Sequence, residues 1–215
     1  MGKFVLKALI TKENKWMVIV TCLLFFSLFY ALTGYLSAKL GTPLEMSEFE
    51  RAIPLLPWTI WIYSALYPAY FLWCFYNFQD VSELNKTLYS FFILTLVSGC
   101  FFVFYPLISP RELYPLTETS SLNARFLLFI RSTDTAGNCL PSLHVGFCYL
   151  FALGFYRTQK HKFVFSMIVA NVISVSTLTT KQHYLVDVIA GALLASMIYF
   201  VMDRWTRVAI PPSQK

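Results

Sequence analysis

The sequence predicts an all-α membrane protein, a single domain that bundles six transmembrane helices and keeps both termini in the cytoplasm. Three observations lead to this prediction. Of the 215 residues, 57% are hydrophobic and only 13% are charged, whereas soluble domains carry about 25% charged residues. Long stretches contain no Asp, Glu, Lys or Arg at all. The Lys and Arg residues are also divided unevenly between the predicted loops, which sets the orientation.

Six apolar segments reach or approach the roughly 20 residues that a helix needs to cross about 30 Å of hydrocarbon. In chain order they cover residues 16–38, 55–77, 88–109, 141–157, 163–180 and 184–203. The first is longer than the apolar core of a cleaved signal peptide, so we expect it to be retained as a helix. Pro141 suits the first turn of the fourth segment. The sixth reaches full length only by starting near His183, which carries Asp187 into the outer edge of the membrane.

The positive charges give the orientation of the six segments. Both termini fall on one side together with the second and fourth loops, and that side holds eleven Lys and Arg residues against six on the other. The excess places both termini in the cytoplasm. The net charge of +6 is therefore largely a topology signal and does not indicate a nucleic-acid partner. The long third loop, about 111–140, has a composition that suits turns and a short surface helix.

The clearest candidate for chemistry is the pair His183 and Asp187 at the start of the sixth segment. A spacing of four residues places the two side chains one turn apart on one helical face. A buried carboxylate can accept the Nδ1 hydrogen of an imidazole and fix its tautomer. The Nε2 lone pair is then free to act as a nucleophile or base. A purely structural polar pair is the alternative, but lipid makes such a pair costly.

A second candidate group opens the fourth segment, at the same side of the membrane. Ser142 and His144 follow Pro141, so both fall in a first helical turn whose amide groups lack intrahelical partners. Such a helix start binds anions, phosphate included. A polar cap at the membrane interface is the structural alternative. Two imidazoles and a carboxylate can also bind zinc. The basic residues expected on this face, Arg111, Arg131 and Lys181, favour a phosphate over a metal.

These two groups resemble the second and third motifs of the type-2 phosphatidic acid phosphatase superfamily. The resemblance rests on Pro-Ser-Leu-His at 141–144 and His-Tyr-Leu-Val-Asp at 183–187, and it covers roughly the last half of the chain. It implies that His183 attacks phosphorus to form a phosphohistidine and that Asp187 orients it. His144 would protonate the leaving oxygen, and Ser142 would bind a phosphoryl oxygen. No metal or organic cofactor is expected.

The chain also departs from the motifs of this superfamily. Leu143 replaces the usual glycine of the second motif, and Thr177 stands where an arginine is expected six residues before the nucleophile. Arg111 matches the arginine of the first motif, but Phe104 occupies the position of its lysine. We expect Lys181, and less strongly Arg131, to supply the missing charge. Leu143 and the His183-Tyr184 pair resemble the branch that contains the fungal inositol phosphorylceramide synthase.

Three functions are compatible with this pattern. The first is a metal-independent lipid phosphatase at the extracytoplasmic face of the inner or plasma membrane. The second is a phosphotransferase that moves a phosphate or head group to a lipid or sugar alcohol. The third is a transporter that binds an anion without chemistry, although the inner halves of the segments show no polar route. Expected substrates are phospholipids or polyprenyl and glycolipid phosphates, and the sequence does not choose among them.

Overall fold

The fold was analysed in a computed structural model that describes residues 3–11, 13–116 and 121–210. Its helices and strands, in chain order, are β1 (Phe4–Lys7), α1 (Lys15–Leu40), β2 (Thr42–Pro43), α2 (Glu48–Ala52), η1 (Pro57–Thr59), η2 (Ile62–Leu66), α3 (Tyr67–Asn77), α4 (Val81–Phe104), β3 (Leu107–Ile108), η3 (Pro110–Leu113), α5 (Leu122–Thr133), α6 (Leu143–Leu153), α7 (Lys160–Thr179), α8 (Leu185–Trp205) and β4 (Thr206–Ala209). The chain is mostly helical, as predicted, with two small additions: β1 pairs with β4 and β2 with β3, both in parallel.

Within the described residues, four helices are long and apolar enough to cross a membrane: α1, α4, α7 and α8. They account for the first, third, fifth and sixth predicted segments. The two remaining segments differ from simple spanning helices, so the count of six spans is not confirmed. The places where these two segments break or end leave space for polar side chains at one end of the helix bundle.

The second predicted segment, 55–77, is broken into η1, the π-helical turn η2 and α3. Pro68 lies at the start of α3; it cannot donate a backbone hydrogen bond, and its ring clashes with the carbonyl four residues earlier. The wider π turn directly precedes it. Such turns often occur at functional sites, and this one carries Tyr63.

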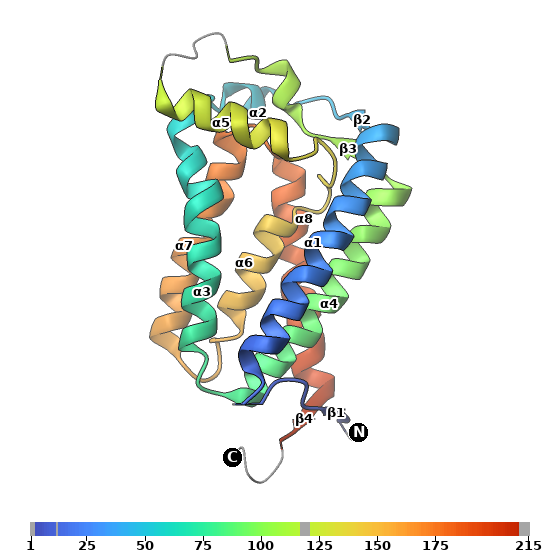
Figure 1. Ribbon diagram of the computed structural model, residues 1–215, viewed down its shortest axis with the longest axis vertical. Helices are drawn as coiled ribbons and strands as arrows, with labels where there is room; N and C mark the ends of the chain where they lie inside the picture. The colour runs from blue at the N-terminus through green and yellow to red at the C-terminus, as the bar shows by residue number, and fades with distance from the viewer. Residues whose placement is uncertain (1–2, 12, 117–120, 211–215) are drawn as a thin grey trace.

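The fourth predicted segment, 141–157, is a shorter helix than expected, because α6 covers only Leu143–Leu153 and turns follow it. Nearly every residue of α6 is buried, and the helix packs against both α7 and α8. A helix that is apolar all round belongs at the centre of a bundle, and Figure 1 shows α6 with α3 on one side and α8 and α1 on the other. It therefore acts as the core against which the other helices are arranged.

The two ends of the bundle have different contents. At the lower end in Figure 1, the first and last described strands, β1 and β4, lie side by side. Near them Asp203 pairs with Lys86 at 3.0 Å and also with Arg157. At the upper end, α5 lies across the bundle and α2 is close by. The starts of α6 and α8 are at this upper end, so Ser142 and His183 share it.

Candidate active site

The site is built where the first turns of α6 and α8 meet. The backbone N–H of Ser142 donates to the carbonyl oxygen of Asp187 at 3.0 Å. Gly191 allows this approach: a Cβ atom at that position would lie 2.4 Å from the Ser142 carbonyl oxygen. Two motifs that are more than forty residues apart in the sequence are thereby held in direct contact.

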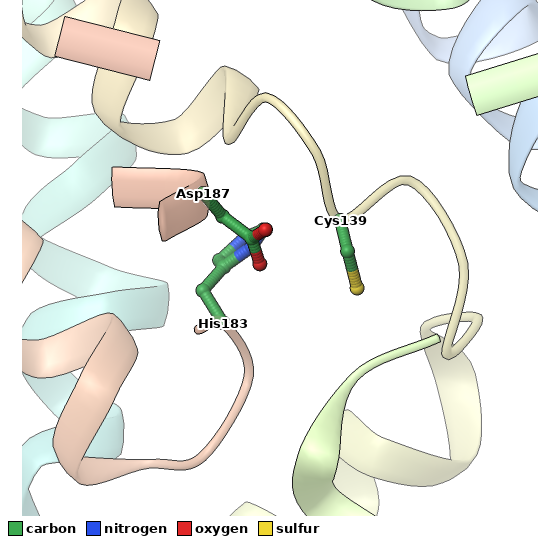
Figure 2. A group of neighbouring side chains, drawn as sticks. All are labelled: Cys139, His183 and Asp187. Atoms are coloured by element: carbon green, nitrogen blue, oxygen red, sulfur yellow. The ribbon is translucent and has the colours of Figure 1, made fainter. Parts of the chain in front are cut away.

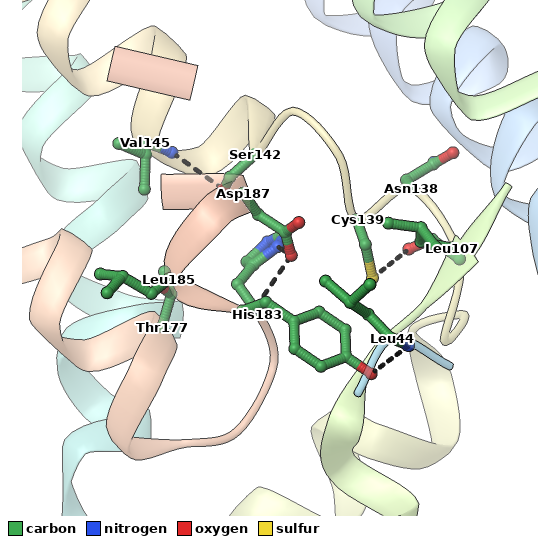
Figure 3. A network of polar contacts seen from close by, with 12 residues as sticks. Leu44, Leu107, Asn138, Cys139, Ser142, Val145, Thr177, His183, Leu185 and Asp187 are labelled. Atoms are coloured by element: carbon green, nitrogen blue, oxygen red, sulfur yellow. Dashed lines mark hydrogen bonds and ion pairs between the residues drawn. The ribbon is translucent and has the colours of Figure 1, made fainter. Parts of the chain in front are cut away.

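The His183 and Asp187 side chains form the predicted pair. His183 Nδ1 lies 3.2 Å from Asp187 Oδ2, and the same oxygen accepts the backbone N–H of Tyr184 at 2.9 Å. Asp187 is thus the third residue of α8, reaching back to the helix start as a capping carboxylate does. Both side chains are buried, with His183 5% exposed and Asp187 fully enclosed. Figure 3 shows the two groups side by side.

The backbone before His183 is also fixed locally. The carbonyl oxygen of Thr177 accepts the N–H groups of Gln182 and His183, at 3.0 and 3.3 Å. Lys181, in the turn between Thr177 and Gln182, adopts a positive φ of 59°. This turn ends α7 and begins α8 within five residues, which sets the position of the imidazole.

His144 is held by aromatic rings. Its imidazole stacks on Tyr63 at a centroid distance of 4.5 Å and lies 4.4 Å from the ring of Tyr67. The His144 and His183 rings are 6.2 Å apart between centroids. The two imidazole rings are therefore neighbours, tilted at 58° to each other. Because Tyr63 belongs to the π turn, the break in the second predicted segment places this ring against His144.

Ser142 caps α6. Its Oγ accepts the N–H of Val145 at 3.4 Å, as Figure 3 shows. A serine hydroxyl also has a hydrogen to donate, and the bond to Val145 does not use it. The first turn of α6 and this hydroxyl lie together, as the sequence indicated, and their role as an anion site stays a prediction.

The predicted cations have different surroundings. Arg111 donates from Nη2 to the carbonyl of Asp134 at 2.9 Å, and its buried Nη1 has no hydrogen-bond partner within the described residues. Arg131 donates to the carbonyl oxygens of Tyr114 and Thr180 at 2.9 and 3.1 Å. Burial and the nearby charge of Arg111 lower the pKa of Arg131 to about 10. The positive charges of Arg111 and Arg131 together favour an anion in this region.

Lys181 is directed elsewhere. Its Nζ donates to the carbonyl oxygens of Glu50 and Ile53, at 3.0 and 2.6 Å, and lies 4.3 Å from the centre of the Tyr114 ring. Burial lowers the pKa of Lys181, and Glu50 opposes that change. The ammonium group therefore holds α2 against the start of α8, and it has fewer free donors than Arg111.

Asp134 and Cys139 also border the site, although the sequence did not indicate them as site residues. Burial raises the pKa of Asp134, and the charges of Arg111 and His183 partly offset this rise. The Cys139 residue is 1% exposed and lies on the loop before α6. Its sulfur is within 4.8 Å of a ligand atom of His183 and of Asp187, its neighbours in Figure 2. Both residues precede Pro141 by only a few positions, but nothing in the sequence pattern indicates that this loop folds back over His183.

A family model described as the PAP2 superfamily matches residues 42–201. The chain belongs to the PAP2 superfamily. The match includes α2, the broken second segment and both histidine motifs, so it extends well beyond the half of the chain in which the resemblance was seen. Membership indicates phosphatase- or phosphotransferase-type activity. No curated protein sequence gives a significant match to the chain.

Proposed function

We propose that this PAP2 protein is an integral-membrane lipid phosphatase that works at the extracytoplasmic face through a phosphohistidine. One observation carries the proposal. His183 is bonded through Nδ1 to the enclosed carboxylate of Asp187, and its ring faces His144 at a centroid distance of 6.2 Å. A nucleophile with its orienting carboxylate and a second imidazole opposite are the parts that phosphoryl transfer through histidine requires.

The first step forms a nitrogen–phosphorus bond. Asp187 accepts the Nδ1 hydrogen of His183, so the Nε2 lone pair is available to attack phosphorus. As that bond forms, the bond from phosphorus to the lipid oxygen breaks. His144 donates its proton to this leaving oxygen, which departs as an alcohol. General acid catalysis of this kind contributes about 10²–10⁴-fold.

In the second step, water attacks phosphorus and the nitrogen–phosphorus bond breaks. His144, now neutral, takes a proton from the water as it attacks. Inorganic phosphate leaves, and His183 regains its Nε2 lone pair. Each proton that His144 gives in the first step is thus recovered in the second, so the cycle needs neither a metal nor an organic cofactor.

Arg111 and the start of α6 are proposed to hold the phosphate. Arg111 has a buried Nη1 without a partner among the described residues, and an anion would supply one. Ser142 adds its hydroxyl, and Arg131 adds positive charge from α5. Lys181 remains a proposed phosphate-binding residue. Because its Nζ already donates to two backbone carbonyls, we expect it to contribute less to phosphate binding than Arg111.

A lipid phosphotransferase is the second candidate, and the cover over the site favours it. Leu127 of α5 is fully enclosed and packs with Ile60 and Tyr63, beside His144. An ordered apolar cover keeps water from the phosphohistidine, which a transferase needs and a phosphatase does not. An alcohol held within about 3–3.5 Å of phosphorus would then react in place of water.

Trapping the intermediate tests the proposal. Purified protein is incubated with lipids carrying a labelled phosphate, from phosphatidic acid to polyprenyl and glycolipid phosphates, and quenched in alkali. The wild type should retain acid-labile label, whereas His183→Ala should retain none and show no turnover. His161→Ala, on an exposed residue of α7, is the matched control and should behave as the wild type. A fully active His183→Ala protein would reject the mechanism.

A chase separates the two candidates. The labelled protein is diluted into water alone and into water with diacylglycerol, ceramide or a lipid A acceptor. Release of free phosphate at a rate that no acceptor changes supports the phosphatase. Label that persists in water and passes quickly into a new lipid identifies the transferase instead.

A further inference from the structure

The thiol of Cys139 adds a third metal-binding side chain to the catalytic pair. One ligand atom from each of Cys139, His183 and Asp187 lies within 4.8 Å of the other two, and all three side chains are buried. Figure 2 shows Cys139 on its loop beside the neighbouring side chains of His183 and Asp187. The three residues come from two separate segments: Cys139 from the loop before α6, and His183 and Asp187 from the turn that leads into α8 and the first turn of that helix.

One carboxylate oxygen of Asp187 is also available to coordinate a metal ion. Asp187 Oδ2 is used by His183 and Tyr184, whereas Oδ1 is buried and has no partner among the described residues. A buried carboxylate oxygen without a partner is costly, and a cation would satisfy it. Among the described residues, the hydrogen bonds of the Cys139 thiol go to the backbone carbonyls of Ala136 and Gly137, at 3.4 and 3.9 Å.

The donor set selects a class of cation. Thiolate, imidazole and carboxylate form three-ligand zinc sites that leave a fourth position open. Tetrahedral bonds of about 2.0–2.3 Å place ligand atoms about 3.5 Å apart, so side-chain shifts of about 1 Å close the site. Magnesium and calcium prefer oxygen ligands and gain little from sulfur. The charges facing the thiol are mixed: Arg111 opposes a cation, while Asp134 and Asp187 favour one.

We propose that Cys139, His183 and Asp187 form an inhibitory site for zinc and similar soft divalent cations. Coordination displaces the thiol proton to solvent and occupies one imidazole nitrogen of His183. Through Nε2, the metal takes the lone pair that attacks phosphorus. Through Nδ1, it displaces the bond to Asp187 and leaves the hydrogen on Nε2. Either mode removes the nucleophile, so bound zinc stops the first chemical step. The activity readout of this inference rests on the proposed function; the binding readout does not.

Cobalt binding to the purified full chain provides a test that needs no substrate. Co²⁺ coordinated by a thiolate gives sulfur-to-metal charge-transfer absorption in the near ultraviolet. The wild type should show this absorption and lose it when Zn²⁺ is added. Cys139→Ser keeps a small polar group but removes the sulfur, so it should show none; Cys139→Ala is a second variant in case serine perturbs folding. Cys100→Ser, at an exposed position in α4, should keep the wild-type spectrum.

Turnover of the labelled lipids gives the second readout. Zn²⁺ should inhibit the wild type, a chelator should reverse the inhibition, and Mg²⁺ should have no effect. Cys139→Ser should keep its basal rate and need at least about tenfold more Zn²⁺ for half inhibition, because even indirect metal partners contribute about 10–100-fold to affinity. Equal zinc sensitivity of the wild type and Cys139→Ser, or a wild type without the cobalt absorption, would overturn the site. If no lipid is turned over, the proposed function fails while the cobalt result still decides this inference.

Discussion

The contacts of His144 show how a single side chain is prepared for its role. The ring lies between Tyr63 and Tyr67, with centroid distances of 4.5 and 4.4 Å, so it cannot turn away from His183 without losing both contacts. The two tyrosines thus act as positioning residues for the proposed role of His144.

Removing one of these rings tests that role. Tyr63→Leu should lower turnover about two- to tenfold, because an aromatic pair contributes about 0.5–1.5 kcal/mol. The loss should be larger for substrates with poor leaving groups, which depend more on the proton from His144. Tyr63→Phe keeps the ring and should stay closer to the wild type. Equal losses for good and poor leaving groups would assign Tyr63 a structural role only.

At the residue scale, the sequence predicted contacts between residues that are close along the chain better than contacts between distant ones. His183 and Asp187 are only four residues apart, so their contact was predicted, although His183 lies before α8 rather than on the same helical face and Asp187 reaches back to it. Tyr63 and Cys139 reach the same site through tertiary packing, and no local periodicity carries that information. Lys181 shows the converse: it is two residues from His183, but the left-handed turn sends its ammonium group to Glu50 and Ile53.

At the scale of elements, the site depends on the close contact of α6 and α8 at Gly191. Gly191→Ala places a methyl group 2.4 Å from the backbone oxygen of Ser142, which cannot move without shifting the first turn of α6. We expect a loss of about 1–3 kcal/mol of stability, typical of overpacking, together with most of the activity. Gly146→Ala is the milder comparison at the same contact, because its methyl group would lie 3.2 Å from the flexible side chain of Leu94 and 3.3 Å from the backbone oxygen of Gly191. Thermal melting and turnover of both variants check this.

Glu50 joins the short helix α2 to the first turn of α8. Its Oε1 accepts the N–H of Leu185 at 2.7 Å, and its Oε2 accepts the N–H and hydroxyl of Ser47 at 2.9 and 2.7 Å. Burial alone would raise the pKa of Glu50, but these hydrogen bonds and Lys181 hold it below its usual value. Since the folded state prefers the ionised form, Glu50 contributes stability above the ordinary carboxyl range and loses it as the pH falls through the lowered value.

Glu50→Gln should therefore melt at a lower temperature than the wild type at neutral pH, and the difference should shrink as the pH is lowered toward 3. Melting curves across this pH range provide the measurement. Glu48→Gln, on an exposed residue of the same helix, should show no such trend. A difference that stays constant with pH would mean that the Glu50 charge does not contribute.

Element boundaries were predicted unevenly, and the reason is physical. Each of the four long helices contains enough apolar residues to be predicted from its own sequence segment. Helix α6 is buried by its neighbours rather than by lipid, so it need not span the full hydrocarbon thickness, and hydropathy overestimates its length. The second segment is as apolar as the others, but the backbone limits set by Pro57 and Pro68 divide it. Apolar composition therefore predicted burial better than it predicted continuous helix.

At the scale of the whole molecule, the polar groups are separated into two ends. The site end holds His183, Asp187 and Arg111, whereas the other end holds the buried pair of Lys86 and Asp203, 3.0 Å apart. This pair links α4 to α8. The parallel pairing of β1 with β4 lies at that same end, so the two ends of the described chain share one side. This arrangement agrees with the same-side termini expected from six segments, and the cytoplasmic orientation expected from the charges stays a prediction.

Labelling of single cysteines decides the orientation. In a variant without the native cysteines, Ser121→Cys reports the site end, because Ser121 is exposed at the start of α5; His161→Cys reports the opposite end, at an exposed position in α7. A membrane-impermeant reagent on intact cells should modify Ser121→Cys, and should reach His161→Cys only after the membrane is opened. The reason is the excess of eleven basic residues over six on the side of the termini, which is retained in the cytoplasm during insertion. The reverse pattern would place the histidines in the cytoplasm, where lipid phosphates of the inner leaflet, rather than the outer one, would meet them. The catalytic geometry would then stand, and only the substrate pool would change.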